Sequence, residues 1–358
     1  MEPAASVNQA LSPPRLEQAI VAGLAYLRQH QYPNGEFCCY YAPDDPMQEW
    51  CQPDSALFPT ALVAGCMLSL QALPVANDML TSATNFLQYQ MLHGGLWTHY
   101  GRAHAWHRLC PPDVDDTSCV SAIMRARGID CPHPSNVPLL LTNRNREGLF
   151  FTWFLLRLRW NANRTYWRVV LPELLRPVQS FVYWREVEAH RNDVDAGVNA
   201  NVLFYLGDRP ETQPVIAWLL RIIAENREAE CDRWYRDPFF IYYFFTRCYH
   251  AGIQKLEPLR APIIARILAQ AQPDGRLGTT LADTAWAVCS LLNLGSYPIE
   301  LEKAVQYLLR HQNNSGEWPR WRLYYGGPKK AIGWGSEELT TGFCLEALAR
   351  YQQHITSG

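Results

Sequence analysis

Three carboxylates lie within four residues, in the run Asp113-Val114-Asp115-Asp116. One aspartate at the start of a helix would serve as an N-cap, a role worth about 1 kcal/mol. Three carboxylates so close together repel one another, and this raises the pKa of at least one of them. A site of this kind can keep a carboxylic acid protonated near neutral pH. The run therefore predicts general-acid chemistry.

Other acids and several large aromatic residues precede or begin apolar segments in the same way. Asp54, Asp237 and Asp283 are expected to be helix caps, since aspartate is a favoured N-cap. Asp283 is also kept as a candidate substrate-binding residue, together with an aromatic set: Trp234, Tyr235, Phe239, Trp286 and Trp334.

A repeat sets the architecture. The segment 26–37 (YLRQHQYPNGEF) aligns with 307–318 (YLLRHQNNSGEW), and Gln90, Gly94, Gly95 and Trp97 give a third copy. A weaker fourth copy holds Gln272 and Gly275. Each copy predicts a helix that ends near a glutamine, a turn through glycine and then an aromatic residue. Internal repeats of this length indicate stacked helical units.

The segment after each turn is apolar nearly all round, as buried helices are. The predicted inner helices cover 56–73, 117–127, 198–207, 239–250, 284–294 and 339–351, and amphipathic segments such as 16–31 and 300–312 precede them. We expect an all-α, single-domain α/α barrel over residues 1–358, with about six outer/inner helix pairs and an insertion at about 155–190. Because every inner helix of such a barrel begins at the same end, the acids and aromatics should gather at one rim.

The acidic run and the repeat together resemble a known family. Asp113-Val114-Asp115-Asp116-Thr117 resembles the Asp-x-Asp-Asp-Thr motif of class II terpene cyclases, the squalene–hopene cyclase relatives, and Gln312…Gly316-Glu317-Trp318 resembles their Gln–Trp motif. The resemblance implies that Asp115 protonates an alkene or epoxide, with Asp113 and Asp116 tuning it. Aromatic faces would then stabilise the carbocation. Asn199 or His107 is a candidate hydrogen-bond partner of the acid.

There is room for a single barrel, whereas members of that family commonly carry two. This favours a shorter isoprenoid such as farnesyl or geranylgeranyl diphosphate, with a meroterpenoid or squalene-like chain as alternatives. A diphosphate would need cations, for which the candidates are Arg320, Arg322, Lys329 and Lys330. No cofactor is required, although Mg²⁺ could assist with a diphosphate.

Other readings of the same residues stay open. Asp193, Asp195, Asn199 and Asn201 could hold a structural calcium or magnesium ion. The barrel could bind an isoprenoid or lipid without turnover. A carbohydrate-active α/α-barrel enzyme would pair Asp115 with Asp283 or Glu337. A prenyltransferase-like zinc site is disfavoured, because Cys231-Asp232 has the wrong order and His250 follows without a motif.

Composition excludes several classes. The net charge of −2, without a basic run, argues against nucleic-acid binding. No apolar run is long enough to span a membrane, and the first residues lack signal-peptide features. The 11 cysteines form no Cys-x-x-Cys pair, which fits free thiols in a reducing cytosol. We expect a cytoplasmic protein with a small-molecule isoprenoid partner, and with peripheral membrane contact through apolar residues and arginines of the insertion as a possible addition.

Overall fold

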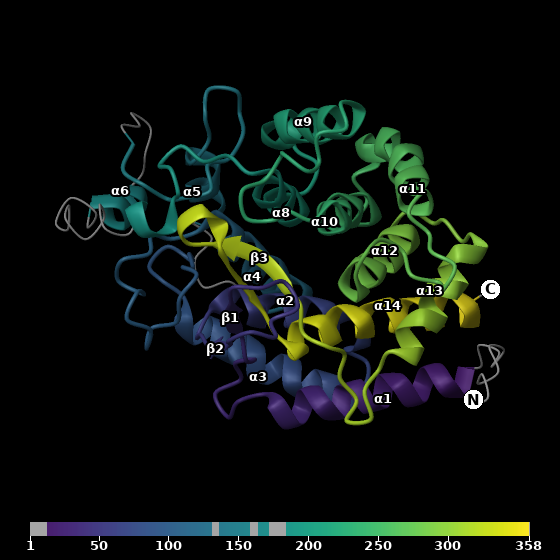
Figure 1. The fold of residues 1–358 in the computed structure, drawn as a ribbon. Helices are drawn as coiled ribbons and strands as arrows, with labels where there is room; N and C mark the ends of the chain where they lie inside the picture. Colours follow the sequence, from purple (N-terminus) through teal and green to yellow (C-terminus); the bar gives the residue numbers. More distant parts are fainter. Residues whose placement is uncertain (1–12, 131–135, 158–163, 172–183, 358) are drawn as a thin grey trace.

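The computed structural model describes residues 13–130, 136–157, 164–171 and 184–357, and in this part of the chain the helices form two concentric rings (Figure 1). The inner ring closes because each inner helix packs on the next and α14 returns to α2. Its members are α2 (Leu57–Met67), α4 (Val114–Ala126), α8 (Ala196–Leu206), α10 (Pro238–His250), α12 (Leu281–Asn293) and α14 (Glu337–Ser357). The predicted α/α barrel is confirmed.

The outer helices lie outside this ring and are amphipathic. In α13, Leu301, Val305 and Leu308 are buried, and their spacing of three to four residues places them on one face of the helix. The outer helices are α1 (Pro13–His30), α3 (Pro74–Gln90), α5 (Asn136–Thr142), α9 (Gln213–Ala224), α11 (Arg260–Leu268) and α13 (Ile299–Arg310). Short 3₁₀ helices join some elements: η1 (Leu68–Leu70), η3 (Pro210–Thr212), η4 (Gln254–Leu259) and η5 (Pro328–Lys330).

The repeated turns join neighbouring outer helices. Gln312, after α13, donates its side-chain amide to the carbonyl of Ala19 in α1 (2.9 Å) and to that of Gly316 in its own turn (2.7 Å). Gln31, after α1, does the same to Met79 of α3 and to Gly35 (both 3.0 Å). The first set of bonds ties the last outer helix to the first, which closes the outer ring.

The aromatic residue of each turn anchors it to the helices behind. Trp318 donates its indole N–H to the carbonyl of Leu308 (2.8 Å), and its backbone N–H donates to the hydroxyl of Thr341 in the inner helix α14 (3.1 Å). Trp97 makes the same two bonds, to Leu87 (2.7 Å) and to Thr117 of α4 (3.0 Å). The motif therefore positions each inner helix against its outer partner.

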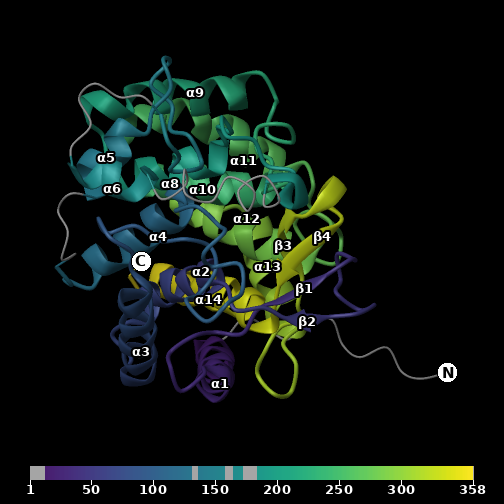
Figure 2. The same ribbon diagram turned by 90° about the vertical axis from the view of Figure 1, so that its left-hand side faces the viewer.

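A small antiparallel sheet, which the repeat pattern does not predict, lies at one end of the barrel. Its strand order is β2 (Gln52–Pro53), β1 (Tyr40–Ala42), β4 (Ile332–Gly335) and β3 (Arg322–Gly326). Figure 2 shows this sheet beside the inner helices, on the side away from the C-terminus. The sheet thus covers the end at which the inner helices begin.

Two helix boundaries differ from the prediction in a way that matters for the site. The helices α4 and α12 begin three residues earlier than expected, so that Asp115, Asp116 and Asp283 lie in first helical turns and not in the preceding loops. Here the negative side chains face the positive end of the helix dipole.

The predicted insertion is described only in part. The described residues include α6 (Arg164–Val170), whereas residues 158–163 and 172–183, with Arg159, Trp160 and Arg176, lie outside them. Within the described ranges, no helix has the length and apolar content that a membrane crossing requires.

Candidate active site

The three carboxylates of the acidic run form one buried cluster at the start of α4. Asp113 is the N-cap, and its Oδ1 accepts hydrogen bonds from the backbone N–H of Asp115 (2.6 Å) and Asp116 (3.4 Å). Asp113, Asp115 and Asp116 are 7%, 6% and 2% exposed. Burial raises the pKa of each, and for Asp113 and Asp116 the neighbouring carboxylates raise it further.

Asp115 differs from its neighbours because both of its oxygens have hydrogen-bond donors. The hydroxyl of Tyr235 donates to Oδ2, and the side-chain amide of Asn201 donates to Oδ1. Behind Asn201, the guanidinium of Arg247 donates to the amide oxygen. Burial raises the pKa of Asp115, while the hydrogen bonds of Tyr235 and Asn201 and the charge of Arg247 oppose that rise.

Arg247 fixes which way the Asn201 amide points. A guanidinium has only donors, so the atom of Asn201 that faces it must be the oxygen. The amide NH₂ then faces Asp115, and Oδ1 of Asp115 acts as an acceptor. A proton on Asp115 is therefore carried by Oδ2, the oxygen beside Tyr235.

Asp116 has a much poorer set of partners. Its Oδ1 is buried and has no hydrogen-bond partner among the described residues, and Oδ2 lies 4.0 Å from Nδ1 of His99. Burial lowers the pKa of His99 to about 4, which leaves this imidazole neutral at pH 7. The cluster accordingly favours a protonated carboxyl at neutral pH.

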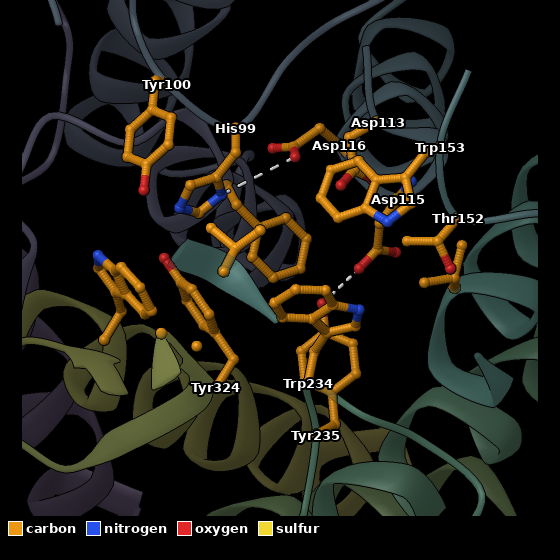
Figure 3. A pocket seen from close by; sticks show the side chains of 16 residues that line it. His99, Tyr100, Asp113, Asp115, Asp116, Thr152, Trp153, Trp234, Tyr235 and Tyr324 are labelled. Atoms are coloured by element: carbon orange, nitrogen blue, oxygen red, sulfur yellow. Dashed lines mark hydrogen bonds and ion pairs between the residues drawn. The ribbon is translucent and has the colours of Figure 1, made fainter. Parts of the chain in front are cut away.

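The acids open onto a small cavity with aromatic walls (Figure 3). Its volume is about 60 Å³, which is below the roughly 300–1,000 Å³ of most ligand pockets. The lining residues are Phe58, His99, Tyr100, Asp113, Asp115, Asp116, Thr152, Trp153, Val187, Val198, Trp234, Tyr235, Tyr324, Gly326, Gly327 and Trp334.

The aromatic walls come from elements far apart in the sequence. Tyr324 of β3 and Trp334 of β4 stack with ring centroids 5.4 Å apart, and Trp153 meets Trp234 edge to face at 5.7 Å. The sheet that covers this end of the barrel therefore supplies one wall directly. Such aromatic faces can stabilise a cation by about 0.5–2 kcal/mol each.

Three of the eight predicted substrate-binding residues line the cavity. Trp234, Tyr235 and Trp334 line the cavity with the three acids, whereas Phe239, Trp286 and Asp283 do not. Trp286 stacks on Phe240 with centroids 4.6 Å apart and belongs to the packed interior of the barrel. The N-cap of α12 is Thr280, so the prediction that Asp283 is the N-cap is wrong, although Asp283 completes a reciprocal capping box with Thr280.

The predicted partners of the acid bond to other groups. The amide of Asn199 donates to the carbonyls of Phe150 (3.0 Å) and Asp195 (2.9 Å). His107 bonds through Nδ1 to the carbonyl of Tyr100 (2.8 Å). The hydrogen bonds to Asp115 come from Asn201 and Tyr235 instead.

The cations expected to hold a diphosphate are dispersed. Arg320 pairs with Glu337 (2.6 Å), and Arg322 pairs with Asp45. Lys329 is exposed and its backbone N–H donates to Glu188 (2.7 Å). Of these candidates, Lys330 alone approaches the cavity wall: its Nζ lies 3.5 Å from the centroid of the Trp234 ring, and burial lowers its pKa to about 8.

The remaining acids of the rim have structural contacts. Asp237 caps α10 by accepting from the N–H of Phe239 (2.8 Å), as predicted. The N-cap of α2 is Ala56, so the prediction that Asp54 is a cap is wrong. Asp54 instead accepts from the indole of Trp334 (2.6 Å) and lies 3.0 Å from Nε2 of His104.

The proposed cation ligands are likewise engaged with protein donors. Asp195 accepts from the hydroxyl of Thr152 (2.6 Å) and from the indole of Trp234 (3.2 Å), and Asp193 pairs with Arg233 (3.2 Å). Over the described residues, no three His, Cys, Asp or Glu side chains are grouped so that they could hold a metal ion.

Several cavity residues are not predicted from the sequence: Phe58, His99, Tyr100, Trp153 and Tyr324. The sequence predicts Asn201 as a metal ligand, whereas it is a partner of the acid. A buried amide in an apolar inner helix requires a partner, but Asn199 in the same helix gives the same signal.

No protein-family model matches the chain, and no curated protein matches it in sequence. Solved structures match in fold. A protein from Actinoplanes has a TM-score of 0.67 at 19% identity, covering 94% of this chain and 99% of its own. The type II terpene cyclase MstE from Scytonema, in its apo form, has a TM-score of 0.66 at 17% identity, covering 96% and 99%.

A second group of similar structures has a different family name. A possible member of the GH105 family from Salmonella enterica has a TM-score of 0.54 at 11% identity, covering 98% of this chain and 97% of its own. At these identities the likeness concerns the fold. The chain shares the α/α-barrel fold of a type II terpene cyclase and, at lower similarity, that of a GH105-type protein.

Proposed function

We propose that this protein is a class II terpene cyclase that starts a carbocation cyclisation of a linear isoprenoid by protonating it from Asp115. The observation that carries the proposal is the buried triple-carboxylate cluster, which opens onto a cavity with aromatic walls. MstE, which shares the fold, has been solved with geranylgeranyl dihydroxybenzoate as substrate and with merosterolic acid A as product.

The two opposing influences on Asp115 suit a proton donor to an alkene. Burial, by raising the pKa, keeps the carboxyl protonated before reaction. Tyr235 and Asn201 then stabilise the carboxylate that remains after Oδ2 has given up its proton. The proton moves to one carbon of the double bond, whose electron pair forms the new C–H bond, and the other carbon becomes the cation. Aromatic faces stabilise that cation while the apolar walls exclude water.

The dispersed cations favour a substrate without a diphosphate. Two of the four cations predicted to hold a diphosphate, Arg320 and Arg322, are paired with Glu337 and Asp45 instead. An isoprenoid joined to an aromatic or other group with at most one negative charge fits better, with Lys330 beside the wall as the cation available to it. The cavity must open further to admit such a chain.

The sugar-active alternative is less well supported. Glycoside hydrolysis needs two carboxyl groups on either side of one bond, about 5–9.5 Å apart. Asp283 belongs to a capping box and Glu337 pairs with Arg320, so neither of the expected second carboxylates lines the cavity with Asp115.

The test is incubation of the purified protein with geranylgeranyl dihydroxybenzoate, farnesyl diphosphate, geranylgeranyl diphosphate, squalene and oxidosqualene. Mass spectrometry detects cyclised products, with and without Mg²⁺. Asp115→Asn has nearly the same shape and is expected to reduce turnover by about 10²–10⁴-fold, the usual contribution of a general acid. An Asp115→Asn variant as active as the wild type would overturn the assignment of the acid.

A further inference from the structure

A second cavity lies at the opposite end of the barrel, where the inner helices end. Its volume is about 520 Å³, far larger than the cavity beside the acids. Three guanidinium groups line it, from Arg125, Arg247 and Arg350, against the single carboxylate of Glu346. Leu62, Ile123 and Phe204 are among the apolar residues of its wall.

Part of this positive charge has structural partners. Arg125 donates to the carbonyls of Tyr205 (2.6 Å) and Phe204 (3.4 Å) at the end of α8, and Arg350 pairs with Glu346 (3.2 Å). A cation near a helix C-terminus is favourable in itself. Three arginines against one carboxylate nevertheless leave an excess of positive charge in a partly enclosed space.

Arg247 keeps part of its hydrogen-bonding capacity unused inside the barrel. Its Nη2 donates to Asn201 and, at 3.9 Å, to the sulfur of Cys119, its Nε is buried without a partner, and Nη1 makes no hydrogen bond to any described residue. Its guanidinium also lies 4.6 Å from the centroid of the Phe204 ring. The Nη1 group, which is not among the buried atoms, is therefore the donor that an anionic ligand in the cavity would engage.

Gly65 is an independent indication that the second cavity has a function, because the residue leaves this cavity unfilled. It lies inside α2, where glycine is less favourable than alanine. Its φ is not positive, and a Cβ built on it meets no atom within 4 Å. Neither backbone conformation nor close packing requires a glycine here, and the space above it belongs to the cavity.

We propose that this cavity, lined by Gly65, Arg247 and Arg350, binds a small amphiphilic anion, whose head group contacts the guanidiniums and whose apolar part lies on Leu62 and Ile123. The binding claim is independent of the proposed cyclase activity. Through Arg247 and Asn201 the cavity is nevertheless in contact with Asp115, so an anion bound there acts on the charge that faces the acid.

The test is isothermal titration calorimetry of the full chain with octyl phosphate, which carries one anionic head and an eight-carbon tail. Octanol is the uncharged control and inorganic phosphate the control without a tail. We expect saturable binding of one octyl phosphate, and weaker binding of either control. Equal binding of octanol, or no saturable binding of octyl phosphate, would overturn the proposal.

Variants locate the site. Gly65→Leu places a large side chain in the cavity beside Leu62 and should weaken binding strongly without lowering the melting temperature, since leucine is the better helix former. Gly65→Ala leaves most of the space and should bind as the wild type does.

Arg350→Gln should weaken binding by about 10- to 100-fold, the value of one hydrogen bond to a charged group. The matched control Arg28→Gln, on the exposed face of α1, should leave it unchanged. Wild-type affinity in Gly65→Leu would place the ligand elsewhere and contradict the proposal.

Discussion

At the scale of single residues, the acid strength of Asp115 depends on a chain of contacts that crosses the barrel. Arg247 orients the amide of Asn201, and this amide and Tyr235 hold the two carboxyl oxygens. The same groups that stabilise the carboxylate make the protonated form a stronger acid. Substitution along this chain should therefore alter proton transfer more than substrate binding.

We predict that Arg247→Gln lowers kcat of the proposed cyclisation by about 10- to 100-fold with little change in KM, the cost of losing a hydrogen bond to a charged group. Glutamine can donate or accept, so the Asn201 amide is no longer held in one orientation. Arg247 lowers the pKa of Asp115, and its removal raises that pKa. Activity needs the protonated acid and falls as pH rises through this pKa, so the fall should move to higher pH in the variant.

The pH profile of kcat/KM, measured beside that of Arg125→Gln, checks this prediction. Arg125 lines the same second cavity but bonds to backbone carbonyls at the end of α8. An unchanged profile in Arg247→Gln, or an equal shift in both variants, would show that Arg247 does not act through Asn201.

The buried acids should also reduce stability at neutral pH. Burial and two neighbouring carboxylates raise the pKa of Asp116 above its value of about 3.9 in an unfolded chain. The folded state then binds the proton more tightly than the unfolded state. The stability contributed by the protonated form is present at low pH and is lost as pH rises from the unfolded value through the folded one.

Asp116→Asn should consequently raise the melting temperature at pH 8, and the gain should shrink towards pH 4. Differential scanning calorimetry across this range gives the comparison, with the exposed Glu230→Gln as control. A gain that is independent of pH would mean that charge burial is not its cause.

The sequence predicts some residues of the site and not others. The clustered spacing of Asp113, Asp115 and Asp116 was visible because it is local. Asn199 was favoured over Asn201, yet residues two apart on a helix point about 200° from each other, so one can face the acid only if the other does not. Which of them does depends on the rotation of α8 against α4, and a single sequence does not contain that information.

At the scale of elements, the Gln–Gly–Trp turns are the part of the fold that the sequence predicted best. The repeat places a glutamine, a glycine and an aromatic residue at fixed positions, and the glutamine bonds within its own turn, as Gln312 does to Gly316. The sheet escaped prediction because its strands are short and β4 pairs with β1, nearly 300 residues earlier in the chain. The cavity wall formed by Tyr324 and Trp334 depends on this distant pairing.

A turn glycine can be required for two reasons: its positive φ, and a neighbouring backbone so close that it leaves no room for a Cβ. Gly316 has φ of +105°, and a Cβ there would lie 2.3 Å from the carbonyl oxygen of Ala22 in α1. Gly295 also has a positive φ, of +59°, but a Cβ there meets nothing within 4 Å. Both positions have a positive φ, but only at Gly316 would a Cβ also collide with a neighbouring helix.

We predict that Gly316→Ala destabilises the protein by several kcal/mol and Gly295→Ala by about 1 kcal/mol, the cost of a left-handed conformation in a non-glycine residue. Urea denaturation of both variants measures the difference in the free energy of unfolding. Equal losses would show that the turn can move away from α1, and hence that it does not fix the closure of the outer ring.

At the scale of the whole molecule, the barrel is stabilised by the contacts that close its ring of helices. The helix α14 lies between α12 and α2 and also packs on α1 and α13, so it joins the end of the chain to its beginning in both rings. Both cavities are bounded by residues from the two halves of the chain. An open ring would expose the apolar sides of α2 and α12, which are buried nearly all round.

Removal of residues 337–358 should therefore abolish cooperative unfolding and not merely lower its midpoint. The exposed flanks of α2 and α12 have no replacement partner, and each buried large apolar side chain left in water loses about 1.5–3 kcal/mol. Circular dichroism against temperature, together with tryptophan fluorescence, should show one coincident transition in the full chain and none in the truncated one. Removal of residues 355–358 alone, which include the exposed Ile355, should leave that transition in place. A single coincident transition in the chain that ends at residue 336 would contradict this prediction. It would show that the remaining inner helices form a stable unit without α14.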